Sequence, residues 1–308
     1  MELVDRLLGG DKVACSKMIT LVENEKSGYA EAMARLSQHG GYSHIIGITG
    51  PPGAGKSTLT DKLAKHMLDQ GHKVGIIAID PTSPFTKGAI LGDRIRMSDL
   101  SVHPNVFIRS MGTRGSLGGL SKATSGAITV LDAYGCDYIF VETVGVGQSE
   151  VDIVKAADTT LMVMVPGLGD DIQAIKAGIM EIGEVFVINK ADKDGAKKAY
   201  REIDSMLDFR KDWDFRPPIS MAIAETGEGI AELIENLMAH KEYLEKSDAK
   251  KMKKQQRINL LVRELIHNEL NKKLDFALES NQSADIENPY IKANQISENI
   301  FKSCDERR

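Results

Sequence analysis

The chain has 308 residues, of which 42% are hydrophobic and 27% are charged, and its formal net charge is -5. This composition is typical of a soluble globular protein with a sizeable core, and it argues against an intrinsically disordered chain. The net negative charge argues against a general nucleic-acid surface, because phosphate backbones are bound by a basic face.

The cysteines and the apolar runs bear on the cellular compartment. Cys15, Cys136 and Cys304 are far apart and odd in number, which is typical of free thiols in a reducing environment. No apolar run approaches the roughly 18 residues of a membrane span, and residues 1–5 lack the basic and apolar regions of a secretory signal. The sequence therefore predicts a cytoplasmic protein that binds neither a membrane nor nucleic acid.

Helical spacing of apolar residues comes first along the chain, over residues 2–40. From residue 44 to about residue 240, short β-branched runs alternate with helical stretches. Apolar strands separated by helices indicate an α/β fold, with a mostly parallel sheet that is covered on both faces and binds ligands at the carboxyl ends of its strands. The predicted strands are residues 45–49, 74–79, 106–109, 138–142, 160–165, 185–188 and 219–222.

The segment after the first predicted strand matches G-x-x-x-x-G-K-[ST], the phosphate-binding loop pattern, and it leads into a predicted helix. Glycines let such a loop turn tightly enough to aim its N–H groups, together with the positive end of the helix dipole, at one anion. Lys56 is expected to reach the β- and γ-phosphates, and the Ser57 hydroxyl is expected to bind Mg²⁺. The predicted nucleotide-binding residues here are Gly50, Pro51, Pro52, Gly53, Ala54, Gly55, Lys56, Ser57 and Thr58.

Acidic residues follow the second and fourth predicted strands. Asp80 and Asp93 are candidates to complete a magnesium site, although aspartates also serve turns and helix caps. Glu142 and Gly145 stand where GTPases carry the first and last residues of D-x-x-G. The longer Glu142 side chain can still reach a water-bridged Mg²⁺, while the Gly145 N–H is expected to meet the γ-phosphate. Val146 replaces the glutamine that orients water in Ras-like GTPases, which predicts slow intrinsic hydrolysis.

A base-reading motif, Asn189-Lys190-Ala191-Asp192, follows the sixth predicted strand and matches the N-K-x-D pattern of GTPases. The Asp192 carboxylate can accept hydrogen bonds from guanine N1–H and the exocyclic amine, whereas adenine has no N1–H and would leave the carboxylate unpaired. Asn189 is expected to brace the loop, and the stem of Lys190 is expected to pack along the base. Together the two motifs predict GTP rather than ATP as the nucleotide.

The composition shifts after about residue 246. A basic run up to Arg257 is interpreted as a solvated helix face, because no aromatic residues accompany it. Apolar residues then recur at helical spacing from Ile258 to Leu274, and they need a partner surface in the domain itself or in a second copy. Residues 279–308 are polar, are interrupted by Pro289, and are expected to fray. The predicted domains are an N-terminal helical extension (1–42), a P-loop GTPase domain (43–245) and a C-terminal helical arm with a polar tail (246–308).

Six segments taken together resemble the MeaB/ArgK family of GTPases, which includes the methylmalonic aciduria type A protein. The most specific of them is V-E-T-V-G-V-G-Q-S-E at 141–150, and the likeness spans nearly the whole chain. The six segments are residues 47–58, 80–84, 91–97, 114–120, 141–150 and 189–192.

The resemblance implies a P-loop fold of the SIMIBI class and a homodimer, with residues 246–308 as the dimerisation arm. It also implies a Mg²⁺-dependent GTPase that acts as a chaperone of an adenosylcobalamin-dependent acyl-CoA mutase, such as methylmalonyl-CoA mutase. The GTPase would gate delivery of the cobalamin cofactor to the mutase and protect the mutase from inactivation. The cobalamin adenosyltransferase system is a further partner that the resemblance suggests.

Residue roles follow from the resemblance position by position. It assigns Lys56 and Ser57 to the phosphates and Mg²⁺, and Asp93 and Glu142 to the magnesium shell. It assigns Asn189 and Asp192 to the base. Residues 167–176 resemble a mobile switch, in which Lys176 is a candidate to stabilise transition-state charge, although a lysine there is also an ordinary exposed helix position.

The chain departs from the family pattern in two loops. Ser116 stands where a histidine is usual, so any role of that imidazole is absent. Ile223 stands where the late base-contacting loop, Ser-Ala-x-x-Gly-x-Gly, begins with serine. An N–H from Ala224 can still meet guanine O6, so guanine selectivity is expected to be kept but to be weaker.

Two other functions stay open. A metallocentre-insertion GTPase tends to carry a histidine-rich tract or closely spaced cysteines, but the seven histidines here are scattered, with none at ligand spacing. A transport-associated nucleotidase or kinase would need a membrane partner or an acceptor pocket that the sequence does not show.

Overall fold

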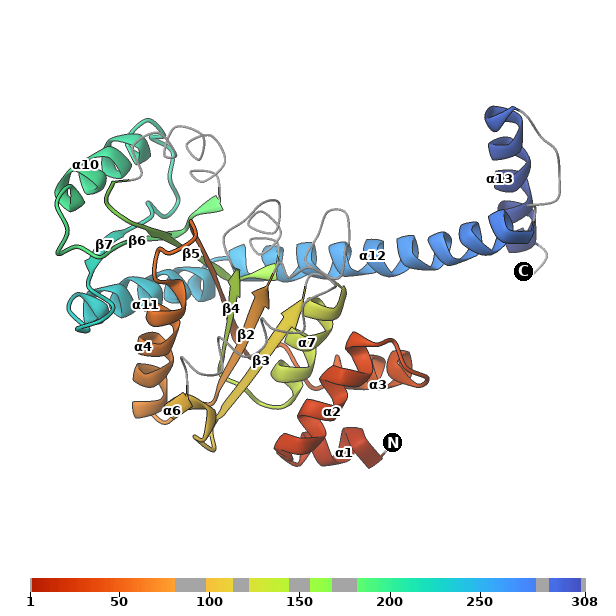
Figure 1. Cartoon of the computed structure of the whole chain (residues 1–308), viewed down its shortest axis with the longest axis horizontal. Coiled ribbons are helices and arrows are strands. Elements are labelled where there is room, and N and C mark those ends of the chain that lie inside the picture. The colour runs from red at the N-terminus through yellow and green to blue at the C-terminus, as the bar shows by residue number, and fades with distance from the viewer. Residues whose placement is uncertain are drawn as a thin grey trace. The chain divides into compact units, whose positions relative to one another are not determined.

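The structure, a computed structural model, describes residues 2–80, 98–112, 122–143, 156–167, 182–280 and 288–305. The chain divides into two compact units, Met1–Gln255 and Gln256–Arg308, and the division falls inside a long helix. Figure 1 shows the helices and strands of each unit. The domain boundaries expected after residues 42 and 245 stay a prediction.

The first unit is built on one seven-stranded sheet whose order is β3-β2-β4-β1-β5-β6-β7, and every pairing among the described residues is parallel. Because all strands run in the same direction, their carboxyl ends share one edge, which is where such sheets bind ligands. This confirms the predicted α/β fold with a parallel sheet. The strands are β1 (His44–Thr49), β2 (Val74–Asp80), β3 (Val106–Gly112), β4 (Tyr138–Thr143), β5 (Thr159–Met164), β6 (Val185–Asn189) and β7 (Ile219–Ala222).

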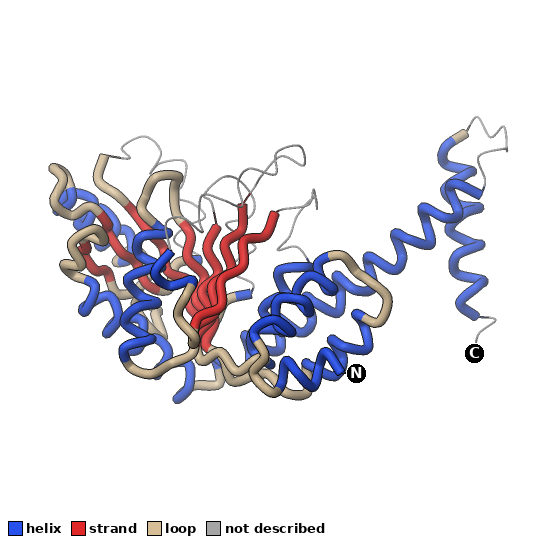
Figure 2. The backbone as a smooth tube through the Cα atoms, turned by 60° about the horizontal axis from the view of Figure 1, so that its bottom comes forward, coloured by secondary structure: helices blue, strands red, loops and turns tan. Residues whose placement is uncertain are grey.

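Helices cover both faces of this sheet, as Figure 2 shows with strands in red and helices in blue. Successive side chains of a strand point to opposite faces, so Ile45 packs into one core and Ile46 into the other. The Ile46 face lies against α4 (Lys56–Asp69) and α11 (Ile230–Lys246). The opposite face lies against α2 (Lys12–Glu23) and α7 (Lys122–Ala133), and further along the sheet against α10 (Ala196–Leu207). The strands are apolar and buried on both sides because helices cover both faces of the sheet.

The N-terminal helices form part of the first unit. The helices α1 (Glu2–Leu8), α2 and α3 (Tyr29–Leu36) contribute buried side chains to the core that α7 shares. The segment that joins α3 to β1 is held by the Asp132 carboxylate, which accepts hydrogen bonds from the N–H groups of Tyr42 (3.2 Å) and Ser43 (2.9 Å). The Ser43 hydroxyl also donates to Asp132 at 2.7 Å. This carboxylate fixes the entry into the central strand.

The C-terminal helices differ from the sequence expectation in two respects. The sequence predicted that residues 279–308 fray, but Pro289–Asp305 form the helix α13, which follows α12 (Ala249–Ser280). The basic run at the start of α12 is not wholly a solvated face, because the Lys253 ammonium forms an ion pair with Glu184 and donates to the Asp158 carbonyl at 2.6 Å. A carboxylate on a neighbouring element cannot be located from the periodicity of α12 alone.

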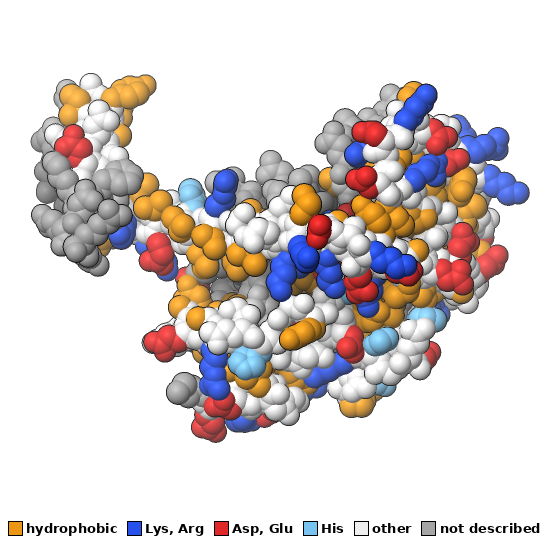
Figure 3. Space-filling model, turned by 180° about the vertical axis from the view of Figure 1, so that it is seen from behind, with side chains coloured by type: hydrophobic (Ala, Val, Ile, Leu, Met, Phe, Trp, Pro, Cys, Tyr) orange, Lys and Arg blue, Asp and Glu red, His pale blue; other side chains and the backbone are white. Residues whose placement is uncertain are grey.

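Apolar side chains remain exposed along α12 in the second unit, and Figure 3 shows hydrophobic side chains gathered along this helix. Within the described part of the chain, no helix is both long enough and apolar enough to cross a membrane. The exposed apolar residues are Ile258, Val262, Leu265, Ile266, Leu270, Leu274, Phe276 and Leu278.

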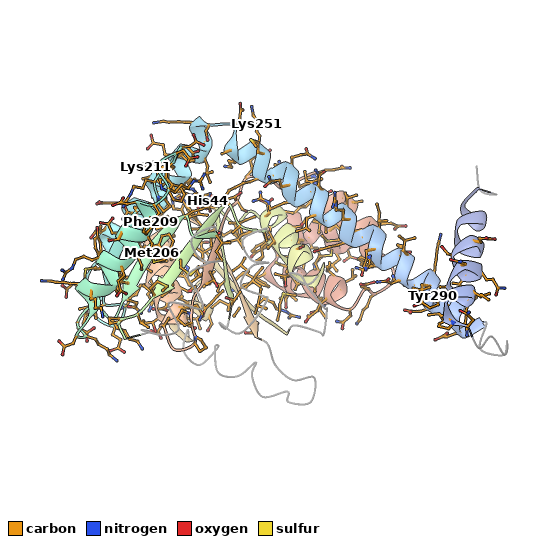
Figure 4. All side chains as sticks on the ribbon, turned by 90° about the horizontal axis from the view of Figure 1, so that it is seen from above. His44, Met206, Phe209, Lys211, Lys251 and Tyr290 are labelled. Atoms are coloured by element: carbon orange, nitrogen blue, oxygen red, sulfur yellow. The ribbon has the colours of Figure 1, made fainter. Side chains whose placement is uncertain are left out.

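A buried polar network lies at the amino-terminal ends of the strands. His44 begins β1 and lies inside the first unit (Figure 4). Its Nε2 is 2.9 Å from the Thr159 hydroxyl oxygen, which is 2.8 Å from Nδ1 of His240 on α11. Burial lowers the pKa of His44 to about 4 and the pKa of His240 to about 3, because a charged imidazole is poorly solvated there. Both histidines therefore stay neutral in the folded protein at neutral pH.

We predict that the protein loses stability as the pH falls from 7 to 5. Unfolded histidines have a pKa of about 6.5, so the unfolded state binds more protons in this range, and each buried histidine is expected to cost on the order of 1–2 kcal/mol at pH 5. Burial raises the pKa of Glu184, so this carboxyl group favours the folded state as the pH falls. This effect opposes that of the histidines, but it comes from one group, whereas two histidines act in the other direction. Thermal melting across this range measures the effect.

The variant H240N tests the assignment, since it removes one of the two titrating rings. Its melting temperature should depend less steeply on pH than that of the natural chain. An equally steep dependence in both proteins would locate the titrating groups elsewhere.

Candidate functional site

The loop after β1 takes its shape from glycines. Gly50 has a φ of 143°, and a Cβ there would lie 2.1 Å from the Val163 carbonyl oxygen of the neighbouring strand β5. Gly55 has a φ of 88°, and a Cβ there would lie 2.3 Å from the Asn189 side-chain nitrogen. At these two positions both the backbone conformation and the available space require glycine.

Lys56 is the first residue of α4, and its side chain is buried against the loop. Its ammonium donates hydrogen bonds to the carbonyl oxygens of Gly50 at 2.8 Å and Pro51 at 2.9 Å. A cation is therefore held beside the N-terminus of a 14-residue helix, where the helix dipole also favours an anion.

Glu142 near the end of β4 is buried beside the first turns of α4. The Ser57 hydroxyl donates to its Oε1 at 2.5 Å, and the Thr60 hydroxyl lies 3.0 Å from its Oε2. The sequence motif pointed to Ser57 and Glu142 separately, and the structure brings them together. Thr60 was not singled out from the sequence, because no nucleotide-binding pattern includes that position.

Asn189 joins the two loops that the motifs define. Its side-chain nitrogen donates to the Ala54 carbonyl at 2.8 Å, and its side-chain oxygen accepts the Ala224 N–H at 3.0 Å. Lys190 adds a second link, since its ammonium donates to the Gly53 carbonyl at 2.7 Å. Lys190 also has a φ of 56°, an uncommon conformation for a residue with a Cβ. The phosphate loop and the base motif are therefore tied into one body.

A pocket lies between these loops. Asp192 is exposed in it, and among the described residues no hydrogen bond or ion pair to its carboxylate is found. Ile223 also lines the pocket, as expected for the first position of the late base-contacting loop. Lys193 and Glu225 line it too, although the sequence motifs gave neither of them a role; their only signal is their place beside Asp192 and Ala224. The pocket is lined by Gly55, Thr58, Asn189, Lys190, Asp192, Lys193, Ile223, Ala224 and Glu225.

The structure bears on the expected contact between Ala224 and a guanine. The Ala224 N–H donates to Asn189 here, so a contact with O6 would require this N–H to be shared or released. Ile223 places an apolar side chain at the pocket where the family pattern has a hydroxyl.

The remaining predicted residues are placed only in part. Asp80 ends β2, where its backbone pairs with Gly112 of β3. The Asp80 side chain and the predicted residues Asp93, Ser116, Gly145 and Lys176 lie outside the part of the chain that the structure describes.

These features together define a P-loop GTPase: a buried strand leads into a glycine loop that packs against a lysine, and an N-K-x-D motif is hydrogen-bonded to that loop. The family follows from comparison. A model described as methylmalonyl-CoA mutase-associated GTPase MeaB matches residues 15–279, so the chain belongs to the MeaB family of GTPases. The resemblance drawn from the sequence motifs is confirmed.

Individual relatives agree with this assignment. A Pyrococcus horikoshii protein named only as a GTPase is 55% identical over 281 residues, which cover 90% of this chain and 89% of that protein. The mouse methylmalonic aciduria type A homolog is 35% identical over 255 residues, which cover 75% of this chain and 61% of that protein. A crystal structure described as an LAO/AO transport system kinase is 25% identical, with a TM-score of 0.73 over 97% of this chain and 96% of that one. The expected P-loop α/β fold is confirmed.

We predict that Gly50→Ala abolishes tight GDP binding and lowers the melting temperature, because the new Cβ would collide with the Val163 carbonyl. Gly53→Ala is the matched control: Gly53 has a φ of 72°, but a Cβ there meets nothing within 4 Å. It is expected to cost only about 1 kcal/mol of backbone strain. Calorimetric GDP titration and thermal melting distinguish the two variants. Equal losses in both would show that φ alone, rather than the collision, decides the effect.

Proposed function

We propose that this GTPase is a chaperone that gates adenosylcobalamin delivery to a cobalamin-dependent acyl-CoA mutase, such as methylmalonyl-CoA mutase, and protects that mutase. The family match over residues 15–279 carries the proposal, because the matched model is described as mutase-associated. The mouse relative, named for methylmalonic aciduria, is consistent with it.

We propose that GTP binds with its phosphates at the loop 50–57. Lys56 would leave the carbonyls of Gly50 and Pro51 to meet the β- and γ-phosphates, so the buried ammonium would exchange two neutral acceptors for charged ones. The N–H groups at the start of α4 would complete the cradle. Gly145 would add an N–H toward the γ-phosphate.

The same site fits Mg²⁺. The Ser57 hydroxyl and the Glu142 carboxylate are adjacent oxygen donors, the ligand type that this ion prefers. Asp80 and Asp93 are proposed to complete the shell. When bound, Mg²⁺ neutralises charge on the phosphates during transfer. Lys176 is proposed to stabilise transition-state charge when the mutase docks, which would make turnover slow alone and faster with the partner.

The base is proposed to lie in the pocket between Asp192 and Ala224. Asp192 lines that pocket as an exposed carboxylate, so a guanine could reach it without breaking a bond to any other described residue. Lys190 is already fixed to the phosphate loop, which would align its stem with the base. This arrangement supports guanine over adenine.

The chain is further proposed to act as a cytoplasmic homodimer, with the cobalamin adenosyltransferase system as a further partner. The exposed apolar residues of α12 support a helical interface with a second copy, because a helix with an uncovered apolar stripe needs a partner surface.

We predict that Asp192→Asn shifts nucleotide preference from GTP toward xanthosine triphosphate. An amide can donate to the xanthine O2 carbonyl but cannot pair with both guanine donors, so GTP affinity should fall by roughly 100-fold or more. Competition against a fluorescent GDP analogue measures the preference. Asp194→Asn is the control, because Asp194 is exposed in the same turn but does not line the pocket. Equal behaviour of the two variants would remove Asp192 from base recognition.

We predict that purified methylmalonyl-CoA mutase raises the GTP hydrolysis rate of this chain by at least about tenfold, as docking partners do for slow GTPases. The measurement is phosphate release with and without the mutase, combined with light scattering in GDP and in a non-hydrolysable GTP analogue. Lys56→Ala serves as the control for contaminating hydrolysis. The proposed partner would be contradicted if the mutase gave no stimulation and formed no nucleotide-dependent complex with this chain.

A further inference from the structure

The Glu142 carboxylate is held through both of its oxygens by hydroxyls of one helix. Ser57 donates to Oε1 at 2.5 Å, and Thr60, one turn further along α4, lies 3.0 Å from Oε2. Glu142 and Thr60 are both buried, so water does not compete strongly for either group. Two contacts from one rigid helix fix the plane of the carboxylate as well as its position.

The Thr60 hydroxyl has two acceptors within reach. Its oxygen lies 3.0 Å from Oε2 of Glu142 and 2.9 Å from the Lys56 carbonyl oxygen, four residues earlier on the same helix. A hydroxyl has a single hydrogen, and a carboxylate acceptor makes a stronger hydrogen bond than a neutral carbonyl. The Thr60 hydroxyl therefore donates its hydrogen preferentially to Glu142, and it donates to the Lys56 carbonyl when the carboxylate moves away. The buried hydroxyl is satisfied in both arrangements.

The contact with Thr60 acts on Ser57 through Glu142. When the Ser57 hydroxyl gives its hydrogen to Oε1, its lone pairs point away from the carboxylate and are available to a cation. The direction of that hydrogen bond depends on where Oε1 lies, and Oε1 is fixed once Thr60 holds Oε2. Partners that orient a metal ligand in this way strongly affect metal affinity.

We propose that Thr60 is a positioning residue for the magnesium site: by holding Oε2 of Glu142, it sets the carboxylate that orients the Ser57 hydroxyl toward Mg²⁺. The inference rests on the magnesium site proposed above and adds a residue to it. Thr60 itself contacts neither the ion nor the nucleotide in this arrangement.

The test compares Mg²⁺ binding in Thr60→Val with that in the natural chain. Valine keeps the shape of threonine but removes the hydroxyl. The readout is release of a fluorescent GDP analogue, which bound Mg²⁺ should slow; the Mg²⁺ concentration that gives half of the slowing reports the affinity of the site. Affinity for the same analogue in EDTA reports the phosphate loop separately. Thermal melting reports the fold, and Thr60→Ala repeats the comparison if the valine variant does not fold.

Two matched variants separate the hydroxyl from helix effects. Thr60→Ser keeps the hydroxyl and should behave like the natural chain. Thr129→Val removes a hydroxyl that donates to a carbonyl four residues earlier, that of Ser125 at 3.1 Å, on α7. That helix lies on the other face of the sheet, so this variant should leave Mg²⁺ affinity unchanged.

We expect Thr60→Val to raise the Mg²⁺ midpoint roughly tenfold, with analogue affinity in EDTA unchanged. In a Glu142→Gln background the same substitution should change the midpoint by less than about twofold, because Thr60 acts on the magnesium site through the Glu142 carboxylate. An unchanged midpoint, or an equal loss of affinity in EDTA, would overturn the role of Thr60. Absence of any Mg²⁺ effect in the natural chain would instead overturn the magnesium site itself.

Discussion

The site depends on the parallel alignment of β1 with β4. Ile48 of β1 lies opposite Glu142 of β4, so the loop and helix that follow β1 rise beside this carboxylate. A shift of one residue would turn Glu142 to the other face of the sheet, away from α4. The register is fixed because both faces of the two strands are buried by helices. Core packing thus determines which charged group meets the first turns of α4.

The two edges of the sheet are chemically separate. At the carboxyl edge, loops present a lysine, hydroxyls and a carboxylate to a polar ligand. At the amino edge, neutral histidines and the Glu184–Lys253 ion pair are closed off from solvent in large part. Loss of the buried network in acid therefore acts on the fold alone, whereas a change in the glycine loop such as Gly50→Ala acts on ligand binding as well as on the fold. The start of α12 belongs to the amino edge through Lys253.

The sequence was sufficient for the sheet and for the phosphate and base motifs, because apolar runs and glycine turns are local signals. It was not sufficient for contacts between elements. Lys253 was interpreted as a solvated lysine because its partner Glu184 is distant in the chain. The helix α13 was missed because Pro289 suggested a break, although proline is common in the first turn of a helix. Thr60 and Lys193 carry no pattern of their own; only the fold places Thr60 against Glu142 and Lys193 in the pocket.

The use of glutamate in place of aspartate has a structural consequence. Glu142 has one more rotatable bond than an aspartate, so holding its carboxylate in one place costs more conformational entropy. The hydrogen bond from Ser57 and the contact from Thr60 both restrict rotation about that bond at the buried end of the side chain. Since both hydroxyls come from the helix that begins at the phosphate loop, the longer side chain is ordered by the same element that would hold the phosphates.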